Sequence, residues 1–300
     1  MEFRLTDDQL ALRTGFRALL DGRFGREALR AAVERPVIDR ALWRELGDAG
    51  LFSLRLPEAD GGVGLGLPEA VLVFEEAGRA LLPGPLVATH LAAGTVPGAD
   101  TGRTVVAASD GALVEWLAEA DEVVGDAADA RPVRSVDPLT PLHRVSGDRG
   151  HPGRSAAALL TAALQLGSAA RTTELAVQYA KEREQFGRPI GGFQAVKHLC
   201  ARMLVRTELA RVAVYAAAVT AEAGGDGTGG GGGAPDTGVA GAKLLADDAA
   251  VRNARDCVQV HGGMGFTWES DVHLHLKRAW VRAGQWITGA EAEELIAAAL

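Results

Sequence analysis

Residues 179–194 carry side chains that could hold a phosphate group. One apolar helical pattern runs into this segment and a second pattern leaves it. The segment also shows the signs of a helix end, because basic side chains precede Gly187 and a proline follows it closely. Arg183 and Gln185 are therefore expected to project from a helix end, where a guanidinium group can bind a phosphate through two hydrogen bonds. The alternative interpretation is a helix-loop-helix corner with a solvated charge cluster.

Two motifs resemble signatures of the acyl-CoA dehydrogenase family. The first is 183–194, Arg-Glu-Gln-Phe-Gly-Arg-Pro-Ile-Gly-Gly-Phe-Gln, and the second is 259–267, Gln-Val-His-Gly-Gly-Met-Gly-Phe-Thr. Their order and separation also match the family, so the chain is identified as a member of it. The resemblance implies that both motifs contribute to an FAD site. The implied cofactor-binding residues are Arg183, Gln185, Phe186, Gln194, Gln259, Val260, His261, Gly262 and Gly263.

The carboxylate that the family uses as catalytic base is missing from the sequence. In the family a Glu or Asp removes the α-proton of an acyl thioester while hydride passes to the flavin. The two positions that the family uses correspond here to Ala157 and Gln285. The segment after Gln285 also lacks the Thr and Glu that contact FAD from the same subunit. No catalytic residue is therefore predicted, and Glu269 and Asp271 are the nearest alternative carboxylates.

Composition bounds the class of protein. The chain has 300 residues, a hydrophobic content of 47% rich in Ala and Leu, and a net charge of −8, which argues against nucleic acid or an anionic membrane as a partner. We see no signal peptide and no long apolar span, so we expect a cytoplasmic protein. Cys200 and Cys257 are expected to be buried free thiols. His273 and His275 lack a third ligand at a recognisable spacing, so no metal site is predicted.

The expected fold is mainly α and resembles the acyl-CoA dehydrogenase fold. We expect an N-terminal helical domain over 1–90, a reduced β-domain over 91–150 and a C-terminal four-helix bundle over 151–300, interrupted by a glycine-rich connector at 224–238. Thr6 and Gln9 have the spacing of a capping box at the first helix. The middle segment holds four β-leaning runs, at 104–108, 112–116, 122–124 and 132–136. It is too short for the family's whole β-domain, although 137–145 resembles the end of that domain.

The retained and missing residues divide into two sets. The resemblance implies that each flavin is shared between two subunits. This chain keeps the residues that contact the flavin of the neighbouring subunit, which are Arg183, Phe186, Gln194 and 259–263. It lacks the catalytic base and the residues that contact FAD in its own subunit. The sequence therefore favours a non-catalytic subunit of a heteromeric, FAD-dependent acyl-CoA dehydrogenase of α2β2 composition. Its partner is expected to be a catalytic subunit that binds the acyl-CoA, with steroid side-chain CoA as a suggested substrate and an electron-transfer flavoprotein as a suggested acceptor.

Two other hypotheses stay open at this stage. One is a self-sufficient homo-oligomeric flavoenzyme that uses an unassigned carboxylate such as Glu269 or Asp271. The other is a flavin-free scaffold or interaction protein that only reuses the helical bundle.

Overall fold

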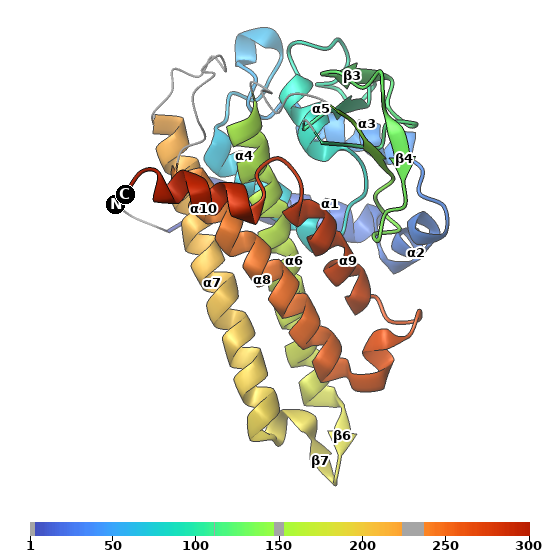
Figure 1. Ribbon diagram of the computed structural model, residues 1–300, viewed down its shortest axis with the longest axis vertical. Helices are drawn as coiled ribbons and strands as arrows, with labels where there is room; N and C mark the ends of the chain where they lie inside the picture. Colours follow the sequence, from blue (N-terminus) through green and yellow to red (C-terminus); the bar gives the residue numbers. More distant parts are fainter. Residues whose placement is uncertain (1–3, 111, 147–152, 224–236) are drawn as a thin grey trace.

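Most of the chain is helical. The structure is a computed structural model that describes residues 4–110, 112–146, 153–223 and 237–300. Within these ranges the chain forms ten α-helices and seven short strands (Figure 1). This content confirms the predicted mainly α class. No helix in the described ranges is long and apolar enough to cross a membrane.

The N-terminal part consists of helices, two of which begin at a residue whose side chain caps the helix. Thr6 accepts a hydrogen bond from the backbone of Gln9 (3.2 Å), and the Gln9 side chain accepts one from the backbone of Thr6 (3.0 Å), which confirms the predicted capping box. Asp39 caps the third helix in a similar way, by accepting from the backbone of Ala41 and Leu42. The elements are α1 (Asp7–Arg23), α2 (Arg26–Glu34), α3 (Arg40–Asp48), a 3₁₀ turn at Glu58–Asp60, α4 (Leu67–Arg79) and α5 (Leu86–Ala92).

The middle segment is a small, open β structure. Its strands are β1 (Val106–Ala108), β2 (Leu113–Glu115), β3 (Glu122–Val124), β4 (Arg131–Val133) and β5 (Leu142–Arg144). Strand β1 pairs in parallel with β3, and β5 lies between β2 and β4 in an antiparallel sheet. The first three predicted runs contain β1, β2 and β3, and the fourth run, 132–136, overlaps β4 but begins one residue after its start. Strand β5 was not predicted as a strand.

The C-terminal part is built on long helices that lie side by side (Figure 1). Its elements are α6 (Arg154–Glu182), β6 (Glu184–Gln185), β7 (Arg188–Pro189), a 3₁₀ turn at Ile190–Gly192, α7 (Gln194–Ala223), α8 (Thr237–His261), η3 (Gly262–Phe266), α9 (Val272–Ala283) and α10 (Gly289–Ala297). Helix α9 packs against α8 and α6 and completes the four-helix arrangement. Residues 224–236 of the predicted connector lie outside the described residues. The predicted end at 238 is two residues late, because Thr237 and Gly238 already belong to α8.

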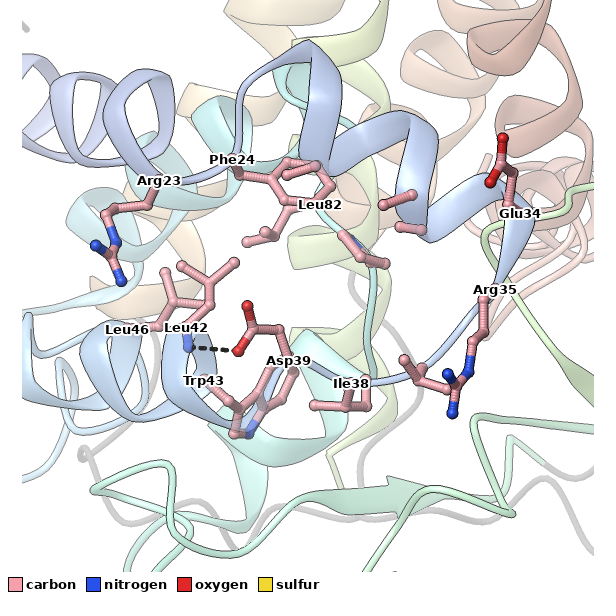
Figure 2. Close-up of a pocket in the computed structure, with 15 residues that line it drawn as sticks. Arg23, Phe24, Glu34, Arg35, Ile38, Asp39, Leu42, Trp43, Leu46 and Leu82 are labelled. Carbon is pink, nitrogen blue, oxygen red and sulfur yellow. Dashed lines mark hydrogen bonds between the residues drawn. The ribbon is translucent and has the colours of Figure 1, made fainter.

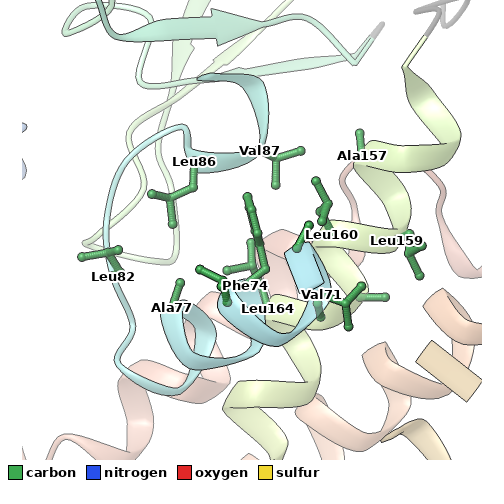
Figure 3. Close-up of a cluster of buried hydrophobic side chains, with 14 of the residues drawn as sticks. Val71, Phe74, Ala77, Leu82, Leu86, Val87, Ala157, Leu159, Leu160 and Leu164 are labelled. Carbon is green, nitrogen blue, oxygen red and sulfur yellow. The ribbon is translucent and has the colours of Figure 1, made fainter. Parts of the chain in front are cut away.

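One apolar core joins the N-terminal helices to the bundle. It extends from Phe16 on α1 to Ala292 on α10, and Figure 3 shows its centre, where Phe74 of α4 lies against Leu164 of α6. The predicted boundary at residue 90 falls inside α5, and the division into three domains stays a prediction.

Two glycines let α4 and α6 approach at backbone distance. A Cβ atom on Gly167 of α6 would lie 1.8 Å from the carbonyl oxygen of Glu75, and one on Gly78 of α4 would lie 2.0 Å from that of Leu164. No side chain fits at either position, because the obstacle is backbone rather than a movable side chain. The crossing of α4 over α6 therefore depends on both glycines.

Buried charge also fixes this crossing. Glu75 and Glu76 of α4 are both buried. Arg17 of α1 binds Glu76 through two hydrogen bonds of 2.6 and 2.7 Å. On the other side, Arg211 and Tyr215 of α7 donate to Glu75, the tyrosine at 2.6 Å. Because a buried carboxylate without partners is costly, these contacts specify how α1 and α7 dock on α4.

We expect Gly167→Ala to destabilise the protein by about 2–3 kcal/mol, because the added methyl group must push α4 and α6 apart. Gly15→Ala in α1 is the matched control, since a Cβ atom at Gly15 meets nothing within 4 Å. That control should gain up to about 1 kcal/mol from helix propensity. Urea unfolding followed by circular dichroism measures both changes. A Gly167→Ala protein as stable as wild type would contradict the backbone contact.

Candidate functional site

The first motif forms a helix end followed by a tight β-hairpin. Helix α6 ends at Glu182, earlier than the predicted break at Gly187, and the backbone N–H of Arg183 donates to the carbonyl of Tyr179 (2.8 Å). Strands β6 and β7 are then joined by Phe186 and Gly187, which have φ angles of 52° and 74°. Two successive residues at positive φ form a turn that suits the twist of a two-residue hairpin. The hairpin is the tip of the bundle in Figure 1.

The hairpin presents exposed groups at the end of the bundle. The side chain of Phe186 is 91% exposed, and its ring contacts Phe193 edge-on at 6.1 Å between centroids. The guanidinium of Arg188 lies over the Phe193 ring at 4.2 Å, so this arginine is held inside the motif. Arg183 is also exposed, and within the described chain its guanidinium has no hydrogen-bond or ion-pair partner. It is free to bind an anion.

The second motif forms an open glycine corner after α8. Gly262 has a φ of 59°, a conformation that favours glycine. Gly263 does not have a positive φ, and a Cβ atom on either residue would meet nothing within 4 Å. Gly265 differs, because its Cβ would lie 2.6 Å from the carbonyl oxygen of Val258. Nothing in the described fold therefore requires glycine at Gly263, whereas close approach of a ligand would.

A ring stack brings the two motifs together. The imidazole of His261 stacks on the ring of Tyr179, one turn before Arg183, with 4.1 Å between centroids and 21° between planes. Its Nδ1–H donates to the carbonyl of Cys257 (2.8 Å). Burial lowers the pKa of His261, although the Cys257 carbonyl opposes this effect. The histidine thus shapes the corner.

The other predicted cofactor residues divide into exposed and buried positions. Gln194 opens α7, and Gln259 lies near the end of α8, and both are exposed. The side-chain amide of Gln185 donates to the Glu184 carbonyl (2.7 Å). Val260 is buried in the apolar cluster under the two motifs, so its side chain faces the core and not the ligand.

The two positions at which the family places its catalytic base are both buried in this chain. Ala157 is fully buried among core side chains (Figure 3). Gln285 is 7% exposed, and its amide donates to the carboxylate of Glu115 on β2 (3.0 Å). The next residue, Trp286, is also buried, and its backbone N–H donates to Asp110 (3.2 Å). The hydrogen bonds of Gln285 and Trp286, at the second position where the family places its base, therefore attach the β segment to the bundle.

Glu115 is a carboxylate that the sequence analysis did not single out. Burial of its carboxyl group raises its pKa, and the Gln285 amide opposes that shift. The residue lies 170 positions before its partner. No local pattern signals such a contact.

The alternative carboxylates are unsuited to act as a base. Asp271 forms ion pairs with Arg26 (2.8 Å) and Arg30 of α2. Glu269 is fully exposed, and hydrogen bonds from its own backbone N–H and from Thr267 lower its pKa. A lowered pKa makes a carboxylate a weaker proton acceptor. Neither residue has the buried setting that strengthens a catalytic base.

His275 and Cys257 are buried inside the bundle. His275 is buried and hydrogen-bonded to Ser168 (2.8 Å), and burial lowers its pKa to about 3. Among the described residues no group of three or more His, Cys, Asp or Glu is arranged to hold a metal ion. Burial raises the pKa of Cys257 to about 12. Both cysteines are free, but Cys200 is only half-buried, which corrects the expectation of two buried thiols.

A separate cavity of about 450 Å³ lies among α1, α2 and α3 (Figure 2). Its wall is mainly apolar and includes Phe24, Leu42 and Leu82, with Asp39 pointing inward from its cap position. None of the nine predicted cofactor residues lines it. The cavity and the two motifs are different features of the molecule.

Comparison with protein families matches both ends of the chain. Residues 6–103 match the model described as acyl-CoA dehydrogenase, N-terminal domain. Residues 155–297 match the model described as acyl-CoA dehydrogenase, C-terminal domain.

Two curated relatives come from Mycobacterium tuberculosis. The acyl-CoA dehydrogenase IpdE2 is 36% identical over 91% of this chain and 91% of its own length. The acyl-CoA dehydrogenase FadE34 is 38% identical over 87% of this chain, but the match spans only 42% of FadE34.

Solved structures share the whole fold. The Tcur3481-Tcur3483 steroid ACAD, G363A variant, is 26% identical and superposes with a TM-score of 0.81 over 97% of both chains. A chain of the ChsE4-ChsE5 complex from Mycobacterium tuberculosis is 24% identical, with a TM-score of 0.84 over 99% of this chain and 98% of that one.

We expect Gln285→Glu to destabilise the protein by about 2 kcal/mol at neutral pH, because it places a second carboxylate against Glu115. The pKa of Glu115 is already raised, so the folded state binds more protons than the unfolded state above the ordinary value of 4.5. The stability that the variant loses relative to wild type should therefore be smallest near pH 4 and should grow as pH rises through the raised pKa. Thermal unfolding between pH 4 and pH 8 measures this loss.

The swapped double variant Glu115→Gln/Gln285→Glu is the matched control, since it restores one amide and one carboxylate. It should recover most of the lost stability. Equal stability of the single and double variants at pH 8 would contradict the buried contact.

Proposed function

The chain belongs to the acyl-CoA dehydrogenase family, and from this premise we propose that it is a non-catalytic subunit of a heteromeric, FAD-dependent acyl-CoA dehydrogenase. In that assembly it completes the flavin site of a catalytic partner subunit. The observation that carries the proposal is a contrast between two parts of the family's site in this chain. The positions of the catalytic base, Ala157 and Gln285, are buried and hold no carboxylate, and we call them the closed half. The cofactor motifs with Arg183 and 262–263 are exposed, and we call them the open half.

The closed half has no group that can remove the α-proton. Ala157 offers only a methyl group, and Gln285 is an amide that is already bound to Glu115. The carboxylate that takes the proton must therefore come from another chain. When bound, the flavin supplies the hydride acceptor for α,β-desaturation of an acyl-CoA thioester.

The open half fits the phosphate-bearing part of FAD. Arg183 offers an exposed guanidinium, and a fork of N–H donors binds a pyrophosphate strongly. Gly262 and Gly263 leave an unobstructed backbone corner, which would let a ligand approach more closely than a side chain allows. The His261–Tyr179 stack holds the corner and the helix end at one location. The residues that would hold the cofactor are Arg183, Gln185, Phe186, Gln194 and 259–263.

The relatives support a two-component assembly. The Tcur3481-Tcur3483 enzyme is a steroid ACAD with two named components, and one of its chains matches this chain over nearly its full length. In FadE34 more than half of the protein lies outside the match. A segment similar to this chain is therefore part of a longer polypeptide in FadE34. We infer an α2β2 assembly and a steroid-CoA substrate on this basis. A cytoplasmic location and an electron-transfer flavoprotein as acceptor stay predictions.

The self-sufficient alternative is less well supported. It requires a base in this chain, but Asp271 is ion-paired and Glu269 is a weakened proton acceptor. The flavin-free scaffold leaves the exposed Arg183 and the glycine at Gly263 without a role.

We expect Arg183→Ala to lower the FAD content of the purified complex at least tenfold, because it removes the charge-assisted bonds to the pyrophosphate. The measurement is the ratio of absorbance at 450 nm to that at 280 nm after gel filtration, together with turnover of an acyl-CoA substrate. Arg44→Ala on α3 is the matched control. Arg44 is also exposed and has no side-chain partner within the described chain, and it should leave both values unchanged.

Full FAD retention and full turnover in Arg183→Ala would contradict the proposed cofactor role. Loss of FAD in both variants would point to a general effect of removing charge and would contradict it as well.

A further inference from the structure

A polar cleft of about 210 Å³ opens beside the crossing of α4 and α6. Four arginines from three helices line it, and we call it the arginine cleft: Arg13 and Arg17 of α1, Arg79 of α4 and Arg211 of α7. On the α6 side its wall includes the small residues Gly167 and Ala170, which leave the space open. A single water needs only about 10–15 Å³ of such space, so the cleft has room for a polyatomic ion together with bound water. It shares no lining residue with the cavity among α1, α2 and α3.

The arginines of the cleft outnumber the carboxylates that pair with them. Three ion pairs account for three of the four arginines: Arg17 with Glu76, Arg79 with Glu174 and Arg211 with Glu75. The fourth, Arg13, is half-buried, and its guanidinium has no hydrogen-bond or ion-pair partner within the described chain. The cleft therefore carries an excess of positive charge. A concave site with charge of one sign in excess attracts ions of the opposite sign.

The paired arginines also keep donors in reserve. Arg17 donates to Glu76 through Nε and Nη2, which leaves its Nη1 without a hydrogen bond in the described ranges. Nη2 of Arg79 and Nη2 of Arg211 are likewise left over, since these residues use their Nε and Nη1 atoms for their partners. None of the three nitrogens is among the buried atoms that lack a partner, and neither is any nitrogen of Arg13, so all of them are accessible to solvent. The cleft thus offers N–H donors from α1, α4 and α7 at one place.

We propose that the arginine cleft binds a phosphate group, carried either by inorganic phosphate or by a phosphomonoester. Guanidinium groups bind phosphate oxygens through pairs of N–H donors, and these charge-assisted bonds are strong. Because the arginines come from three different helices, they surround a ligand instead of lying in one plane. This arrangement suits a tetrahedral group better than a planar carboxylate. A monatomic anion such as chloride uses few of the donors.

The arginine cleft is separate from the proposed cofactor site and does not depend on it. Gly167 lies fifteen residues before the end of α6 at Glu182, which is about 23 Å along the helix axis. A phosphate in the cleft connects α1 and α7 across the crossing of α4 and α6, so it acts on the stability of this crossing and not on the flavin. A ligand that binds only the folded state raises the stability of that state by mass action.

Thermal unfolding in phosphate tests the proposal. About 10 mM sodium phosphate should raise the melting temperature of the chain by about 3 °C relative to sodium chloride at the same ionic strength. Arg13→Gln should abolish this rise, and isothermal titration calorimetry should show at least tenfold weaker binding of phosphate. Arg44→Gln on α3 is the matched control, because Arg44 is exposed and has no side-chain partner within the described chain. It should keep both the rise and the affinity.

A second variant keeps the test decisive if Arg13→Gln does not fold. Arg13→Lys retains the charge but loses the planar fork of donors, and it should bind phosphate more weakly than wild type. Equal stabilisation by phosphate and chloride would overturn the site, and so would equal phosphate affinity in wild type and both Arg13 variants. Loss of phosphate binding in Arg183→Ala alone would locate the anion at the cofactor motif and would overturn the site while the proposed function stands.

Phenyl phosphate distinguishes the two carriers of the phosphate group. Titrated into the chain beside inorganic phosphate, it should bind more tightly if the cleft serves a phosphomonoester and more weakly if it serves the free ion. Either result supports the site, provided that Arg13→Gln weakens the binding of both probes. Binding of phenyl phosphate that Arg13→Gln leaves unchanged would overturn it.

Discussion

The backbone contact between α4 and α6 is the constraint on which the rest of the structure depends. Gly78 and Gly167 allow the two helices to cross so closely that each carbonyl occupies the space of the other helix's missing side chain. The buried carboxylates of Glu75 and Glu76 then attach α7 and α1 to the same crossing through hydrogen bonds. Because α6 is 29 residues long, fixing its first half in this way also directs its second half, which projects beyond the N-terminal helices and carries the hairpin.

This arrangement gives α6 two different ends. At its start Ala157 is sealed in the apolar core, and the Glu115–Gln285 contact closes the other base position. At its far end Arg183 and the corner at Gly262 are open to solvent and are held together by the His261–Tyr179 stack. The positions where the family places its base hold Ala157 and Gln285, which pack inside the protein. The residues that would hold an anion, Arg183 and the glycines at 262–263, are exposed. The contrast is what a subunit that lends half a cofactor site to a neighbour would require.

Much of the fold could be predicted from local pattern, and the remainder depended on distant contacts. The Thr6–Gln9 capping box and four of the five middle strands follow from short-range spacing. The early end of α6 was missed because Arg183 is already extended and leads into the hairpin, which Phe186 closes at a positive φ that sequence does not favour for phenylalanine. The Glu115–Gln285 contact joins residues far apart in sequence and could not be read from either neighbourhood. The half-exposure of Cys200 likewise reflects its place at the edge of the apolar cluster under the two motifs, which periodicity alone does not show.

The flavin content of the chain, alone and with its catalytic partner, tests the central claim most directly. The visible spectrum of each purified product, with FAD released and quantified against protein, is the measurement. The account predicts a colourless chain alone and a yellow complex with about one FAD per heterodimer, because neither subunit holds a complete site. A yellow chain in the absence of any partner would show that it contains a complete flavin site and would contradict the account.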